Sequence, residues 1–349
     1  MNRRKFIAAG AVGLGAATTG AVAGWFGAGS KRGKTDKRVL DARYTYDVSA
    51  FEHTDPALLL YEQTRLIAAG IQEPSCLAVG PGDMIFVGGD QSVKVLDKDG
   101  NLKSTLRLAE RPHALAPSED GRLFVAMKDH LEVLDRTGKS LVRGETLGDK
   151  THLTAVAFSG KDVFVADAGN REVLRCDPGN GKVLSRFGKS AGNGDHPGFA
   201  VPSPCFDLMI GSDGLLWVVN PGRHRVEAFT LDGRFQRGWG TTALSIEGFC
   251  GCCNPVYFTQ LPDGRFVTSE KGLNRIKIYD AEGKFQGVVA GPEHLVKDRE
   301  LARKACANGQ IGFGYDVACD SMNRVLALDP VGCRILIFTP KTGKRMVPS

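Results

Sequence analysis

The chain has 349 residues, of which 42% are hydrophobic, so it is long enough to bury a large core. Its formal net charge is +6, and Arg3, Arg4 and Lys5 supply three of the positive charges. The remaining excess is small, and the one basic run, residues 31–43, has no interleaved aromatic residues. We therefore expect no nucleic-acid partner and interpret this run as a solvated linker.

The N-terminus has the pattern of an export signal. Arg3 and Arg4 are followed by Phe6, and no charged residue occurs from Phe6 to Ser30. The segment resembles a twin-arginine signal, a route associated with proteins that fold before export. Ala21-Val22-Ala23 offers a cleavage site, although the uncharged stretch is also long enough to act as a membrane anchor. We expect residues 1–30 to be this signal or anchor and the protein to be periplasmic or otherwise exported.

Residues 31–63 are expected to form a linker and an N-terminal extension. Within it, residues 44–51 have strand character, and residues 55–62 are interpreted as a linker or a short helix. Residues 64–71 again have strand character. Because an open ring of strands exposes its edges, we expect this last segment to close the final repeat described next.

Six stretches then repeat one pattern, in which an apolar strand is followed by a turn, usually with Asp-Gly, and by two further strands. The copies begin at Pro74, Pro112, His152, Cys205, Asn254 and Gly314. A self-similar unit of about forty residues, nearly all strand, is typical of a β-propeller. Residues 64–349 are therefore predicted to form an all-β, six-bladed propeller with four-stranded blades, closed by the N-terminal strand and monomeric.

The spacing between the copies increases after the third, which indicates insertions. These fall at residues 188–204, 241–253 and 291–313, always between the last strand of one blade and the first strand of the next. Such crossovers emerge on one rim, so we expect all three insertions on one face. In the third, Leu295, Leu301 and Ala305 lie among charged residues, as in a short helix.

The repeats resemble NHL repeats, which have a Val-x-Asp strand end followed by an Asn-Arg turn. Here Val165-Ala166-Asp167 precedes Asn170-Arg171, and Ala327-Leu328-Asp329 precedes Arg334. Blades one and two lack the pattern. The resemblance implies the propeller fold but not one function, because NHL proteins include binding scaffolds, sensors and a few lyases.

Cysteines form the most unusual motif of the chain. Cys250, Cys252 and Cys253 lie in the second insertion, and Cys306 lies in the third, one blade later on the same rim. Four converging thiolates suit an iron–sulfur cluster, Zn or Cu. We therefore predict these four cysteines as ligands in a protein of a periplasmic redox or electron-transfer system. Its partner would be another protein, such as a membrane redox complex, with membrane contact only through an uncleaved anchor.

Disulfides are the alternative, because exported proteins meet an oxidising compartment. A Cys252–Cys253 bond would be strained, since adjacent Cα atoms are about 3.8 Å apart and disulfides usually need about 4.4–6.8 Å. Cys250–Cys306 or Cys253–Cys306 pairs would be unstrained. The chain would then be a stapled scaffold that binds a protein, peptide or glycan. A redox-active thiol pair is a third interpretation, and Cys205 is a substitute ligand.

The axis of the propeller offers a separate candidate site. Alignment of the blades places Asp207 and Asp316 in one column of the innermost strands and His113 in the column before it. One His and two Asp could hold a divalent metal or act as acid and base, as in a lyase or hydrolase. The alternative is that these side chains bind channel water or satisfy backbone groups.

Overall fold

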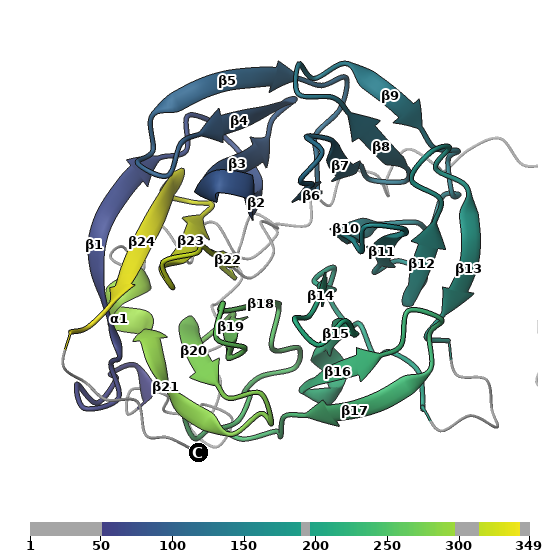
Figure 1. The fold of residues 1–349 in the computed structure, drawn as a ribbon. Coiled ribbons are helices and arrows are strands. Elements are labelled where there is room, and N and C mark those ends of the chain that lie inside the picture. The colour runs from purple at the N-terminus through teal and green to yellow at the C-terminus, as the bar shows by residue number, and fades with distance from the viewer. Residues whose placement is uncertain (1–50, 190–195, 297–313, 343–349) are drawn as a thin grey trace, which may run out of the picture. The chain divides into compact units, whose positions relative to one another are not determined.

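Six sheets of four antiparallel strands make up the described part of the chain. The computed structural model describes residues 51–189, 196–296 and 314–342. In Figure 1 the sheets are arranged as blades around a central axis, with the first strand of each blade innermost. The predicted six-bladed β-propeller is confirmed. Among the described residues, no helix has the length and apolar character needed to cross a membrane.

The strands of a blade follow one another along the chain, from the axis outwards. The first three blades consist of β2 (Pro74–Gly80), β3 (Met84–Gly89), β4 (Ser92–Leu96) and β5 (Leu102–Arg107); β6 (Ala114–Pro117), β7 (Leu123–Ala126), β8 (Leu131–Leu134) and β9 (Ser140–Arg143); and β10 (Leu153–Phe158), β11 (Val163–Asp167), β12 (Glu172–Cys176) and β13 (Val183–Phe187). The next two consist of β14 (Leu208–Ile210), β15 (Leu216–Asn220), β16 (Arg225–Phe229) and β17 (Phe235–Trp239); and β18 (Tyr257–Gln260), β19 (Phe266–Glu270), β20 (Arg275–Tyr279) and β21 (Phe285–Ala290).

The sixth blade is closed by a strand from the start of the propeller. It consists of β22 (Asp316–Cys319), β23 (Val325–Asp329) and β24 (Arg334–Pro340), and its outermost strand is β1 (Tyr61–Ala68), which pairs antiparallel with β24. The predicted closing strand is confirmed, although it begins at Tyr61 rather than at residue 64. The segment expected as a linker or helix forms a turn at residues 56–58, and Leu59 then makes a bridge to Val288 of β21.

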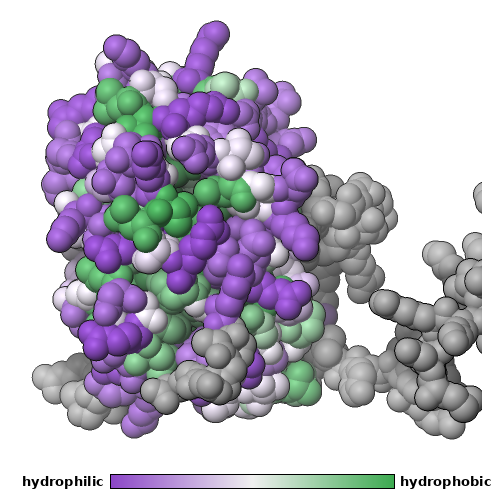
Figure 2. Space-filling model, turned by 90° about the vertical axis from the view of Figure 1, so that its right-hand side faces the viewer, coloured by the Kyte–Doolittle hydropathy of each residue, from purple (hydrophilic) through white to green (hydrophobic). Residues whose placement is uncertain are grey.

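The middle strands explain the apolar repeats. The second strands of the last four blades (β11, β15, β19 and β23) are buried at every position, because neighbouring blades cover both of their faces. Outermost strands are more polar: in β5 only one of six residues is buried. Figure 2 shows the outer surface on the side of β9 and β13, where apolar patches are separated by hydrophilic side chains. Charged side chains on these outer strands disfavour edge-to-edge association.

Polar side chains join the innermost strands of neighbouring blades. The hydrogen bonds across these junctions include Ser75 Oγ to Pro112 O (2.6 Å), His113 Nδ1 to Leu153 O (3.1 Å), Thr154 Oγ1 to Phe206 O (2.6 Å), Phe258 N to Asp207 Oδ2 (2.9 Å) and Leu77 N to Asp316 Oδ2 (2.7 Å). They satisfy buried backbone groups that the short inner strands leave unpaired.

The three insertions occupy the predicted crossovers. They connect β13 to β14, β17 to β18 and β21 to β22. Because strands alternate in direction within each blade, these connections begin on the same face. The third opens with the one-turn helix α1 (Pro292–Leu295). Leu301, Ala305, Cys306 and residues 1–50, with the proposed export signal, lie outside the described residues.

Candidate functional site

The second insertion is attached to the blade that follows it by Glu270, the last residue of β19. Its Oε2 accepts a hydrogen bond from the backbone N–H of Cys250 at 3.2 Å. The equivalent strand ends act similarly in earlier blades: Asp167 accepts from His152 N at 3.1 Å, and Asn220 accepts from Ala200 N at 2.9 Å. A polar residue at the end of the second strand thus fixes the crossover that enters its own blade.

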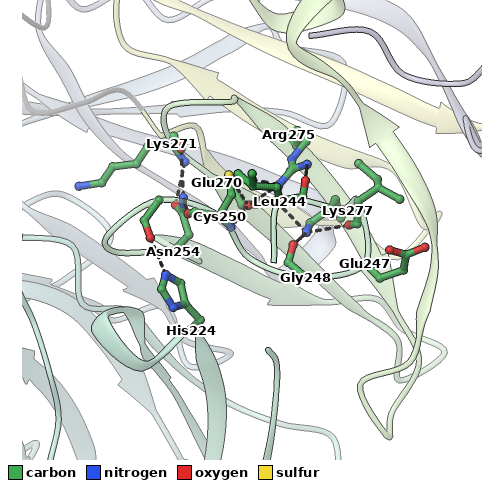
Figure 3. Close-up of polar contacts among 12 residues, drawn as sticks. His224, Leu244, Glu247, Gly248, Cys250, Asn254, Glu270, Lys271, Arg275 and Lys277 are labelled. Carbon is green, nitrogen blue, oxygen red and sulfur yellow. Dashed lines mark hydrogen bonds and ion pairs between the residues drawn. The ribbon is translucent and has the colours of Figure 1, made fainter. Parts of the chain in front are cut away.

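Blade five differs from the others because its anchor is part of a fully buried ion cluster (Figure 3). Glu270 Oε2 lies 2.9 Å from Arg275 Nη2, and Glu270 Oε1 lies 2.8 Å from Lys277 Nζ. The exposed fractions of the three side chains are 0%, 2% and 0%. Burial lowers the pKa of Lys277 to about 8, against the opposing effect of Glu270. Two cations around one carboxylate are costly to bury unless further groups stabilise them.

Backbone carbonyls of the insertion provide that stabilisation. Lys277 Nζ donates to Gly248 O at 2.6 Å and to Ile246 O at 3.0 Å. Tyr279 Oη donates to Glu247 O at 3.0 Å, and the ring of Phe249 lies 4.6 Å from Lys277 Nζ. The ion cluster and the insertion therefore stabilise each other.

A second set of hydrogen bonds fixes the turn that contains the cysteines. Asn254 Nδ2 donates to Cys250 O at 2.6 Å, and Asn254 Oδ1 accepts from Lys271 N at 2.9 Å. His224 Nε2 donates to Gly251 O at 2.8 Å. Gly251 has a φ of 80°, which glycine adopts without strain. The backbone from Cys250 to Asn254 is thereby held on both sides.

Cys252 and Cys253 lie side by side, with 3.1 Å between their Sγ atoms. Cys252 is exposed, whereas only 1% of Cys253 is exposed. Burial would raise the pKa of the Cys253 thiol, but hydrogen bonds with Lys271, Ser203 and Cys252 outweigh it and lower the pKa. Lys271 Nζ also donates to Ser203 Oγ at 2.9 Å. The pair therefore combines a buried sulfur that favours the thiolate with an accessible thiol.

Cys250 faces a different environment from the pair. Its Sγ accepts from Arg275 Nη2 at 3.3 Å and lies 3.6 Å from Glu270 Oε2. Burial, together with the charge of Glu270, raises the pKa of this thiol. The structure thus brings two of the three predicted cysteines together and directs the third towards the ion cluster, while Cys306 lies outside the described residues.

All eight cysteines in the described ranges are free thiols. The substitute ligand Cys205 is buried close to the pair, because Ser203 forms hydrogen bonds with both Cys205 and Cys253. Burial raises the pKa of Cys205, as it does for Cys76 and Cys176.

The axial candidates all line one channel of about 290 Å³. Burial raises the pKa of Asp316 to about 7, and burial together with Asp316 raises the pKa of Asp207 well above its usual range. Burial and His152 lower the pKa of His113 to about 4. Near neutral pH the channel therefore holds a neutral imidazole and a carboxyl group poised to exchange a proton.

The axial side chains also satisfy backbone groups, as their alternative interpretation predicted. Asp207, Asp316 and His113 each form one of the hydrogen bonds between neighbouring blades. One oxygen of each carboxyl group therefore binds a backbone N–H of the next blade.

The side chains of the basic turn at residues 223–225 form hydrogen bonds within the protein. Arg223 donates to Gly198 O, and Arg225 donates to Gly238 O. His224 accepts from Thr242 Oγ1 at its other ring nitrogen. Arg223 and His224 thereby bind the first and second insertions, and Arg225 binds strand β17.

Sequence reasoning missed two groups. No sequence signal marked the Glu270 cluster, because Arg275 and Lys277 alternate with Ile276 and Ile278, as in a strand with one exposed face. Glu110, Asp129 and His130 also lie together, with potential ligand atoms within 4.8 Å of one another, and are the only such group of three or more in the described ranges. Arg143 pairs with Glu110 at 2.8 Å. Glu110 lies in a different loop from the adjacent Asp129 and His130, so no sequence spacing marks the group.

No protein-family model matches the chain, and no curated protein matches it either. Solved structures do share the fold. A streptogramin B lyase is 14% identical with a TM-score of 0.52, over 77% of this chain and 79% of that chain. A protein of unknown function from Bacteroides thetaiotaomicron is 14% identical with a TM-score of 0.56, over 80% and 76%. A catalytically inactive virginiamycin B lyase from Staphylococcus aureus, solved with quinupristin, is 12% identical with a TM-score of 0.52, over 77% and 80%. At these identities, the similarity shows the propeller fold alone.

We predict that Glu270→Gln lowers the free energy of unfolding by about 3–5 kcal/mol, because Arg275 and Lys277 would stay buried without a carboxylate. Urea denaturation measures the change. Asp263→Asn is the matched control: it removes a partly exposed partner of Arg265, and its cost should stay below about 1 kcal/mol. Equal losses in the two variants would contradict a special role for the buried cluster.

Asp316 should make stability depend on pH. The unfolded carboxyl group loses its proton above about pH 4, whereas the folded one keeps it up to about pH 7. The folded state binds more protons in this window, so stability should fall as pH rises from 4 to 7, by on the order of a few kcal/mol. Asp316→Asn should reduce this slope in urea denaturation at pH 4.5 and 7.5, and Asp207, whose pKa is also raised, should account for the remainder. An unchanged slope would show that Asp316 does not change its protonation between these two pH values.

Proposed function

We propose that this chain is an exported NHL-type β-propeller that binds a thiophilic metal ion or an iron–sulfur cluster in a periplasmic redox or electron-transfer system. The observation that supports this best is the pair of Cys252 and Cys253, with sulfur atoms 3.1 Å apart and a lowered pKa at Cys253. Soft metals bind the thiolate form, so a site that deprotonates one sulfur in advance favours them.

The remaining ligands follow from the crossovers. Cys306 belongs to the next crossover of the same face and is the expected third ligand. Cys250 joins the set only if its sulfur leaves Arg275, whose guanidinium lies 3.3 Å away. A protein partner would then meet the protein on the face that bears the insertions.

The proposed export route supports binding of the metal or cluster before the protein is secreted. Arg3-Arg4-Lys5-Phe6 begins a signal of twin-arginine type, and that route is associated with proteins that fold around a cofactor first. The protein would act as a periplasmic monomer, held at the membrane only if the N-terminal segment is not cleaved.

Elemental analysis of the anaerobically purified full chain tests the proposal. We expect a thiophilic metal near one equivalent, or the iron and sulfide of one cluster, and its loss in Cys252→Ser. Cys333→Ser is the matched control because Cys333 lies in another blade. Metal-free protein whose loop thiols react with alkylating agents only after reduction would favour the disulfide-stapled scaffold instead.

The axial channel supports a second candidate, acid–base catalysis by a lyase or hydrolase. Asp316, with a pKa of about 7, and neutral His113 line one channel, and two of the structural neighbours are lyases. A carboxyl group near neutrality can give and take a proton at little cost. A divalent ion held by Asp207 and Asp316 would be the alternative use of the same carboxyl groups.

Quinupristin is an available probe for the lyase candidate. If the channel is catalytic towards this class, the chain should consume quinupristin with a rate that falls at least about tenfold in Asp316→Asn, as expected for loss of a general acid or base. Asp263→Asn should keep the rate. The absence of turnover by the parent chain would rule out this substrate class.

A further inference from the structure

Resting on the proposed thiolate site, we propose that the Cys252–Cys253 pair binds a neutral, pyramidal species of trivalent arsenic in preference to a divalent cation. Three properties of the pair lead to this choice: the separation of its sulfur atoms, the number of ligands around it and the charge beside it.

The separation of the two sulfur atoms is short for a tetrahedral metal. With a metal–sulfur bond of about 2.3 Å, tetrahedral zinc requires sulfur atoms about 3.8 Å apart. The observed 3.1 Å corresponds to an angle at the bound atom of about 85° for the same bond length. In trivalent arsenic, the lone pair compresses the bond angles towards a right angle. Arsenic therefore matches the pair with little movement of either side chain.

The number of nearby ligands leads to the same conclusion. In the described ranges, no group of three or more Cys, His, Asp or Glu includes Cys252 or Cys253. Structural zinc and iron–sulfur sites take four protein ligands. Trivalent arsenic needs three bonds, and a hydroxide or an organic group can supply the third. The protein then needs to supply only two thiols to bind trivalent arsenic.

The charge beside the pair opposes a free cation. Lys271 is hydrogen-bonded to Cys253 and to Ser203. Its ammonium group repels an incoming divalent ion over a distance of a few ångströms. Arsenous acid and hydrated organoarsenicals approach as neutral molecules, so they avoid this repulsion.

The binding step is a condensation without redox change. Each thiol forms one As–S bond, and its proton leaves with one hydroxide of arsenous acid as water; Cys252 is the exposed member of the pair. Two thiols and arsenous acid thus give a neutral cyclic dithioarsenite and two waters. Two As–O bonds are replaced by two As–S bonds, and arsenic stays trivalent.

Phenylarsine oxide is the probe for the test, added to the reduced full chain. We expect the mass of one arsenical to be added per chain and two thiols to disappear in a thiol titration. Cys252→Ser should weaken binding at least about tenfold, because one of two bonds is lost. Cys333→Ser should bind as the parent chain does, because Cys333 lies in another blade. Zn²⁺ in a parallel titration should bind at least about tenfold more weakly than the arsenical.

The outcomes separate this inference from the function on which it rests. Tight Zn²⁺ or Cu⁺ binding without arsenical binding would overturn the preference for arsenic but leave the thiolate site in place. Loss of arsenical binding in Cys306→Ser would overturn the two-sulfur site. Failure of the parent chain to bind the arsenical or either metal ion would overturn both proposals.

Discussion

The architecture of the candidate site depends on one hydrogen bond that recurs from blade to blade. A polar side chain at the end of the second strand accepts the backbone N–H of the crossover that enters the same blade, as Asp167, Asn220 and Glu270 do. Because the first two insertions lie in such crossovers, the bonds of Asn220 and Glu270 fix where these two inserted loops meet the blades. The position of the cysteines is therefore a property of the repeat, although the cysteines themselves depart from it.

In blade five the residue that accepts this hydrogen bond also forms ion pairs. It is a glutamate, Glu270, and its longer side chain reaches both Arg275 and Lys277 in a region closed to solvent. Buried ion clusters add little stability over apolar packing, but they penalise arrangements in which a partner is missing. We infer that the cluster selects one placement of the loop, since Lys277 also needs the carbonyls of Ile246 and Gly248.

Periodicity predicted the blades, the closing strand and the places of the insertions, because each depends on local patterns of apolar residues and turns. It could not predict the direction of the Cys250 side chain, which is set by residues on the neighbouring strands. Periodicity also placed Asp316 on the channel. It could not predict the hydrogen bond from Leu77 to Asp316, because these residues are 239 positions apart and meet only when the ring is closed. The middle strands are buried on both faces, so alternation gave no warning that Lys277 was a buried charge.

The closure of the sixth blade also governs when folding can finish. Leu66 of β1 pairs with Leu336 of β24, near opposite ends of the propeller sequence. During synthesis, β1 leaves the ribosome first and has no partner until almost the whole chain has followed. Contacts between such distant segments form slowly, and unpaired strand edges attract other chains in the meantime. If synthesis stopped before β24, the released chain would leave β1 and β23 with unpaired edges, and it would be exposed to proteolysis and aggregation.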